Sequence, residues 1–175
     1  MMKALKTLHE YDLSLFNRLH PVRLNGDFIR FNRYISSSGD GHLYLLLLAW
    51  TGWQEGYQNP FFIAILTGFA IERPAYYILK NSFKRNRPES VLAGFCSIIR
   101  PGDRFSFPSG HTSAAFMIAM LCGYFYPALF FWLLGWALLV GVSRVVLGVH
   151  FPTDTLVGMG LGVGAALISM EIVLS

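Results

Sequence analysis

Residues 141–154 read GVSRVVLGVHFPTD and lie at the junction of two long apolar runs. They bring Ser143, Arg144, His150 and Asp154 together in one short stretch. A charged side chain beside lipid costs about 2.5–3.5 kcal/mol at the centre of a membrane helix. An Arg, a His and an Asp gathered at an apolar boundary, where water reaches them, therefore indicate a functional site.

The composition predicts a membrane protein with a single domain. Of the 175 residues, 54% are hydrophobic and 14% are charged, whereas soluble domains carry about 25% charged residues. The apolar residues come in long blocks and not in the stripes of amphipathic elements. We therefore expect an integral membrane protein in a lipid bilayer, with one domain that covers residues 1–175.

Several other classes of protein are disfavoured. The net charge of +4 is small, so we expect no nucleic-acid partner. Cys96 and Cys122 stand alone in the sequence, which argues against a disulfide framework or a zinc site. Residues 1–20 carry several charges and lack an apolar core segment, so we expect no cleavable signal peptide there. Neither composition nor pattern predicts an oligomeric state.

The apolar runs predict an all-α integral membrane bundle of five to six transmembrane helices. A spanning helix needs about 20 residues, so we expect the first span to begin near Phe28 and to have a loosened middle at 39–41. Residues 3–19 have amphipathic helical spacing, which predicts a helix lying on the membrane surface or a solvated helix packed on the bundle. The expected spans cover residues 28–53, 60–83, 111–126, 128–147 and 153–174.

Four polar side chains fall inside or beside these spans. Intramembrane charges usually face the bundle interior and pair with one another. We therefore interpret Glu72 and Arg73 as a structural pair or a kink site beside Pro74, and contact with a substrate is the less favoured interpretation. For Asp40 and His42 we favour helix capping or packing over a functional role.

The topology predicts one site built from three polar clusters. If the spans alternate across the bilayer, residues 80–87, 109–111 and 144–154 all lie on the same membrane face. A random scatter of polar residues over helix ends would divide them between the two faces. The agreement therefore points to a single constellation of side chains.

The first two clusters suit an anion. Lys80 and Arg87 are separated by about two helical turns, and Arg offers a bidentate fork for phosphate oxygens. The alternative is a basic patch that meets anionic lipid headgroups. Ser109, Gly110 and His111 open a helix whose free N–H groups and dipole attract an anion. The alternative there is an ordinary capped helix with a surface His.

The third cluster adds a nucleophile. Pro152 suits the first position of a helix, which leaves His150 just outside and puts Asp154 in the first turn. Asp154 can then accept a hydrogen bond from one imidazole nitrogen and leave the other as a nucleophile. With Arg144, the clusters predict phosphoryl transfer, in which cations neutralise the transferring group, one His attacks phosphorus and the other protonates the leaving oxygen. No carboxylate cluster suits Mg²⁺, so we expect no metal and no other cofactor.

These residues form a pattern that resembles the signature of the type 2 phosphatidic acid phosphatase (PAP2) superfamily of membrane lipid phosphatases. The signature reads K-x6-RP, PSGH and SR-x5-H-x3-D, and every position is filled within residues 80–158. The resemblance implies that His150 is a nucleophile that forms a phosphohistidine, that Asp154 orients it and that His111 is the general acid. It also implies phosphate binding by Lys80, Arg87, Ser109, the Gly110 N–H and Arg144.

The resemblance further implies a membrane lipid phosphate as the substrate. We expect metal-independent dephosphorylation of undecaprenyl diphosphate to undecaprenyl phosphate, with phosphatidylglycerophosphate and phosphatidic acid as alternative substrates. A lipid phosphotransferase would use the same residues, whereas a non-enzymatic channel or scaffold would use none of them. Family members of this size imply the bacterial inner membrane and an active site on its periplasmic, outer face. The basic residues between 80 and 104 favour the opposite orientation by the positive-inside rule.

Overall fold

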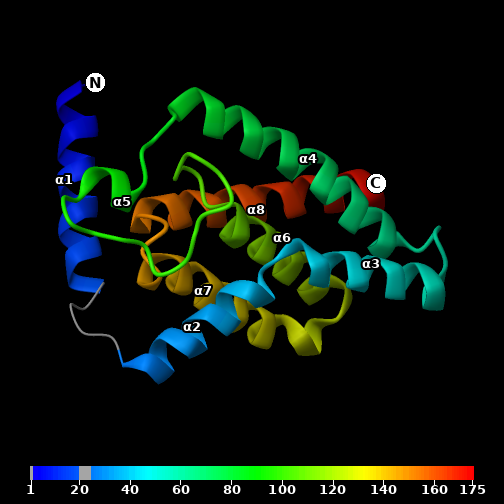
Figure 1. Cartoon of the computed structure of the whole chain (residues 1–175). Helices are drawn as coiled ribbons and strands as arrows, with labels where there is room; N and C mark the ends of the chain where they lie inside the picture. The colour runs from blue at the N-terminus through cyan, green and yellow to red at the C-terminus, as the bar shows by residue number, and fades with distance from the viewer. Residues whose placement is uncertain (1, 20–24) are drawn as a thin grey trace.

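The structure is a computed structural model that describes residues 2–19 and 25–175, with side chains described for residues 10–18 and 25–175. All regular secondary structure in these ranges is helical, which confirms the predicted all-α fold (Figure 1). The helices are α1 (Met2–Leu19), α2 (Gly26–Ser38), α3 (Gly41–Glu55), α4 (Pro60–Phe83), α5 (Pro88–Val91), α6 (Gly110–Phe125), the 3₁₀ helix η1 (Pro127–Leu129), α7 (Phe130–Val146) and α8 (Pro152–Leu174).

Helix α6 forms the centre of the bundle and packs against α4, α7 and α8 (Figure 1). Its buried apolar side chains, among them Met117 and Leu121, fill the space between these helices. Helix α8 comes so close to α6 that a Cβ atom on Gly162 would lie 2.1 Å from the carbonyl oxygen of Ser113. A Cβ atom on Gly160 would have no neighbouring heavy atom within 4 Å in the described part of the chain. Glycine therefore permits the close helix contact at one face of α8 and is not needed for packing at the other.

Local sequence signals set the starts of two long helices. The Asn59 side chain caps α4 by accepting a hydrogen bond from the Phe61 N–H at 2.7 Å, and a proline occupies the first helical position. Pro152 begins α8, as the sequence predicts, and the Asp154 carboxylate accepts a hydrogen bond from the Phe151 N–H at 2.8 Å. The two starts lie at opposite ends of the bundle, so α4 and α8 run antiparallel (Figure 1).

The first expected span consists of two helices. Helix α2 ends at Ser38 and α3 begins at Gly41, so the loosening expected at 39–41 is a complete break. The backbone of Gly39 lies against α7, where a Cβ atom would come 2.9 Å from Cγ1 of Val140. The absence of a side chain lets the chain turn in contact with α7. The break leaves Asp40 at the junction of the two helices.

Three segments are long and apolar enough to cross a membrane in the described part of the chain: Pro60–Val91, Pro127–Val146 and Pro152–Leu174. The expected number of five to six spanning helices goes beyond this finding and stays a prediction. Many large apolar side chains point outward from the bundle, as expected for a surface that faces lipid. Those most exposed include Leu45, Trp53, Ile78, Phe131, Trp132 and Leu156.

Helix α1 lies across one end of the bundle, at a steep angle to α4 and α8 (Figure 1). The buried ring of Phe16 contacts the rings of Phe95 and Phe151, with centroids 5.4 and 5.6 Å apart. The Asp12 side chain is also buried. The predicted helix is therefore present and packed on the bundle, and its location at the membrane surface stays a prediction.

The contact between α6 and α8 predicts different effects for two glycines on the same helix. Gly162→Ala should destabilise the protein by about 1–3 kcal/mol, the usual cost of overpacking a core, because the added methyl group meets Ser113. Gly160→Ala is the matched control and should be neutral or slightly stabilising, because alanine favours a helix and the site is open. Thermal unfolding in detergent measures both, and equal melting temperatures would contradict the close contact.

Candidate active site

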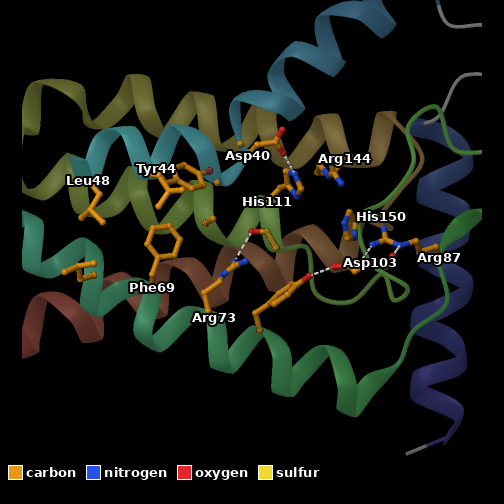
Figure 2. Close-up of a pocket in the computed structure, with 18 residues that line it drawn as sticks. Asp40, Tyr44, Leu48, Phe69, Arg73, Arg87, Asp103, His111, Arg144 and His150 are labelled. Carbon is orange, nitrogen blue, oxygen red and sulfur yellow. Dashed lines mark hydrogen bonds and ion pairs between the residues drawn. The ribbon is translucent and has the colours of Figure 1, made fainter. Parts of the chain in front are cut away.

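A cavity of about 510 Å³ opens where α3, α4, α6 and α7 meet the loop before α6 (Figure 2). One end is polar and is lined by Arg87, His111, Arg144 and His150. The other end is apolar and extends between α3 and α4. Its lining there includes Leu45, Leu48, Leu66 and Phe69. The cavity can therefore accept a molecule with an anionic head and a hydrocarbon tail.

His150 lies at the polar end of this cavity and is 2% exposed. Burial lowers the pKa of its imidazole to about 4; the Asp154 carboxylate opposes this shift and the Arg144 charge adds to it. The ring is thus neutral at neutral pH, as a nitrogen nucleophile requires. Its Nδ1 lies 3.8 Å from Oδ2 of Asp154, which is longer than a hydrogen bond.

Asp154 is held by groups other than His150. Arg85 donates to Oδ1 of Asp154 at 2.8 Å, and the same guanidinium donates to Oδ2 of Asp12 at 2.5 Å. Arg85 also donates to the Thr153 hydroxyl at 2.7 Å. Arg85 therefore ties α1 to the start of α8 and fixes the carboxylate behind His150. From the sequence alone, Arg85 is only one of the basic residues between 80 and 104.

Lys80 and Arg87 converge on the carboxylate of Asp103. Lys80 Nζ lies 2.5 Å from Oδ2, and the Tyr76 hydroxyl donates to the same oxygen at 2.5 Å. Arg87 Nη2 donates to Oδ1 (Figure 2). Burial opposes ionisation of this carboxyl, but the bonds from Lys80 and Tyr76 and the charges of Lys80 and Arg87 lower its pKa to about 2. Asp103 therefore stays ionised and binds the two cations much as a phosphate would.

Arg144 reaches the cavity from the last turn of α7 and is 5% exposed. Its Nη1 donates to the Ser36 hydroxyl at 2.5 Å. Its Nε is buried and has no hydrogen-bond partner in the described part of the chain. A guanidinium with a buried, unused donor beside His150 is poised to bind an anion in the cavity.

The start of α6 contributes Gly110 and His111 to the cavity wall. The Gly110 Cα lies so close to the Tyr76 ring that a Cβ atom would come 2.9 Å from Cε2. The His111 Nε2 lies 2.7 Å from Oδ1 of Asp40 (Figure 2). Asp40 occupies the N-cap position of α3, as one of the two favoured interpretations expected, but its side chain makes no capping hydrogen bond and contacts His111 instead.

The structure thus brings the three predicted clusters to one end of the bundle, where some of their residues line the cavity and others lie behind the lining residues. His111, His150, Gly110, Arg87 and Arg144 line the cavity. The other predicted residues lie behind its wall: Asp154 beside His150, Lys80 against Asp103, and Ser109, whose buried hydroxyl bonds the Thr112 hydroxyl at 2.9 Å.

Sequence reasoning missed Asp103, Tyr76 and the role of Asp40. The only sequence signal was a carboxylate in the Gly-rich loop six residues before Ser109. In the described ranges, no cluster of three or more His, Cys, Asp or Glu side chains could hold a metal ion.

Comparison with known proteins identifies the family. The profile of the PAP2 superfamily matches residues 59–174, a range that contains all three polar clusters. The chain belongs to the PAP2 superfamily. Together with the three candidate spans, this membership makes the chain an integral membrane protein.

Individual relatives agree with this assignment. The chain is 34% identical over 111 residues to phosphatidylglycerophosphatase B of Bacillus subtilis (strain 168), which covers 57% of this chain and 52% of that protein. The crystal structure of Aquifex aeolicus LpxE superposes on this chain with a TM-score of 0.81 and 27% sequence identity, and the match covers 91% of this chain and 94% of the LpxE chain.

The crystal structure of a PAP2-type phosphatidylglycerolphosphate phosphatase from Bacillus subtilis superposes on this chain with a TM-score of 0.79 and 26% sequence identity. The match covers 95% of this chain and 86% of the chain of that phosphatase. The alignments with the curated relatives span about half the length of those proteins.

The contacts of Asp103 predict that its charge competes with a bound anion. In the Asp103→Asn variant, orthophosphate and vanadate should bind about tenfold more tightly, because one charge-assisted competitor for Lys80 and Arg87 is removed. Isothermal titration calorimetry in detergent measures this binding. The matched control is Asp27→Asn, which removes an exposed carboxylate paired with Arg30. Weaker anion binding in Asp103→Asn would instead show that Asp103 is required to hold the two cations in place.

Proposed function

We propose that the chain is a lipid phosphate phosphatase that acts through a phosphohistidine at His150 and needs no metal ion. One observation carries this proposal. A buried, neutral His150 and the guanidinium groups of Arg87 and Arg144 line the polar end of a cavity whose other end is apolar. A nucleophile, an anion site and a tail site thus share one space.

In the first step, a ring nitrogen of His150 attacks the phosphorus atom and the bond to the leaving oxygen breaks. The electron pair stays on that oxygen, which takes a proton from His111. Arg87 and Arg144 neutralise the non-bridging oxygens as charge shifts in the transition state. Asp154 stabilises the positive charge that forms on the His150 ring.

In the second step, water attacks the phosphohistidine. His111, now neutral, accepts a proton from the water as the bond between phosphorus and nitrogen breaks. Inorganic phosphate leaves and the His150 ring is neutral again. The Asp40 carboxylate, 2.7 Å from Nε2 of His111, orients the His111 ring through both steps.

The substrate we favour is undecaprenyl diphosphate, which would yield undecaprenyl phosphate. Phosphatidylglycerophosphate and phosphatidic acid are the alternatives. The cavity of about 510 Å³ is large enough for a phosphorylated headgroup and the first part of a tail. The rest of any long tail would leave between α3 and α4 and lie in the bilayer.

We place the protein in the bacterial inner membrane with the catalytic end on the periplasmic side. The positive-inside rule counts Lys and Arg residues in short loops near the ends of spans. On the catalytic end, Lys80, Arg85 and Arg87 are each bound to a carboxylate. These three charges belong to the site and its support, which weakens the argument for a cytoplasmic catalytic end.

Phosphate release from defined lipids tests the proposed activity. Purified protein in detergent with EDTA should release phosphate from at least one of undecaprenyl diphosphate, phosphatidylglycerophosphate and phosphatidic acid. His150→Ala should lower the rate by at least about 10³-fold, as loss of a nucleophile does. His42→Ala is the matched control, because His42 is exposed, and it should retain full activity.

Three results would count against the proposal. Loss of activity in EDTA would contradict the metal-free mechanism. An active His150→Ala variant would exclude His150 as the nucleophile. Folded protein that releases no phosphate from any of the three lipids would argue for transfer to another acceptor or for a role without catalysis.

A further inference from the structure

One face of α4 lines the cavity from Leu66 to Tyr76. The residues on this face follow helical spacing, and their character changes along the helix. The apolar part comes first, a single arginine follows, and the phosphate-binding end comes last. In order, they are Leu66, Phe69, Arg73 and Tyr76, and Lys80 follows one turn later, behind the cavity wall. Arg73 therefore stands between the tail end of the cavity and the catalytic end (Figure 2).

Arg73 is anchored and still accessible. Its Nε and Nη2 bind the carboxylate of Glu72, whose side chain is 0% exposed. Its guanidinium lies 4.8 Å from the centroid of the Tyr76 ring, and Nη2 donates to the Gly110 carbonyl oxygen at 3.5 Å. The Arg73 side chain itself is 39% exposed. The cation is thus fixed against α6 with one side open to the cavity.

A purely structural ion pair does not account for this placement. Glu72 engages Nε and Nη2, and a guanidinium has five N–H donors. In the described part of the chain, no hydrogen bond from Nη1 is found. The two N–H groups of Nη1 remain for a further acceptor, in a cavity whose neighbouring wall is apolar. A buried carboxylate could be neutralised equally well by a cation that does not face the cavity.

We propose that Arg73 binds a second phosphate group of the substrate, on the tail side of the phosphate that His150 attacks. This inference rests on the proposed function and names its substrate class: lipids that carry two phosphate groups in series. Arg73 and Lys80 are separated by about 10 Å along the helix axis at 1.5 Å per residue. The second phosphate would therefore lie beside Arg73, between the catalytic end and the apolar end of the cavity.

Two kinds of lipid provide this chemistry. In a polyprenyl diphosphate the second phosphate is joined directly to the first. In a glycerophospholipid phosphate such as phosphatidylglycerophosphate, a phosphodiester follows after a glycerol unit. The shared feature is an anionic phosphate between the scissile group and the tail. Monophosphate lipids with the same tails lack it and serve as matched substrates.

The test compares matched lipids and matched variants. The lipid pairs are undecaprenyl diphosphate with undecaprenyl phosphate, and phosphatidylglycerophosphate with phosphatidic acid. Arg73→Gln alone would leave the buried Glu72 unpaired. We therefore compare Glu72→Gln with the double variant Glu72→Gln/Arg73→Gln, because both lack the buried carboxylate and they differ only at Arg73. Where a monophosphate is not turned over, its inhibition constant replaces kcat/KM.

The double variant should lose about tenfold in kcat/KM for the lipid with two phosphates, relative to Glu72→Gln, mainly through a higher KM. Its kcat/KM for the matched monophosphate should change less than about twofold. A selective loss in the polyprenyl pair identifies a diphosphate substrate, and one confined to the glycerolipid pair identifies the phosphodiester. Equal losses for both members of a pair would overturn the inference and leave Arg73 a structural role.

Two further measurements keep the outcomes distinct. If the wild type releases no phosphate from any of these lipids, the proposed function itself fails, and the inference about Arg73 fails with it. A wild type that is active and shows no selective loss in the variant rejects only the inference about Arg73. If the double variant does not fold, as judged by size-exclusion chromatography and thermal unfolding, Arg73→Lys replaces it. Lysine retains the charge beside Glu72 but lacks the free Nη1 fork. It should show the same selective loss, and an unchanged preference would overturn the inference.

Discussion

The site depends on keeping three cations buried at one end of an apolar bundle. A buried charge without partners is costly, so each cation must be held by other groups. Arg87 donates to the carbonyl oxygens of Asp103 and Val149 and to the Asp103 carboxylate. Lys80 bonds the same carboxylate, and Arg144 bonds Ser36. The loop before α6, the turn before α8 and the end of α2 therefore take their positions partly from these side chains.

The same burial determines the chemistry that the site can perform. Withdrawal from water and the nearby positive charges favour the neutral form of His150. The same positive charges also favour an anion in the space beside it. Asp154 is fixed by Arg85 and the Phe151 N–H, so its carboxylate can remain in place while the neighbouring ring gains and loses charge. The 3.8 Å separation from His150 is compatible with a catalytic role, because catalytic hydrogen bonds are often long in structures without substrate.

The sequence allowed prediction of those features that depend on local pattern. The starts of α4 and α8 are predicted by Pro60 and Pro152, each of which follows a short connection and suits the first position of a helix. The location of the three polar clusters at one membrane face is predicted by the alternation of the spans. The break between α2 and α3 and the contact of Asp40 with His111 depend on how Gly39 meets α7. Asp103 depends on the path of the loop before α6, and Arg85 on the position of α1. No periodicity encodes such long-range contacts, which is why they were not predicted.

The most direct test of the account is to identify the residue that carries phosphate during turnover. Protein turning over a lipid substrate would be denatured rapidly in alkali, which preserves phosphohistidine, and its peptides analysed by mass spectrometry. The account predicts a phosphoryl group on His150 that forms within the first turnover and is lost on treatment with acid. A phosphoryl group on another side chain, or a first turnover at full rate with no phosphoryl group on the protein, would contradict it.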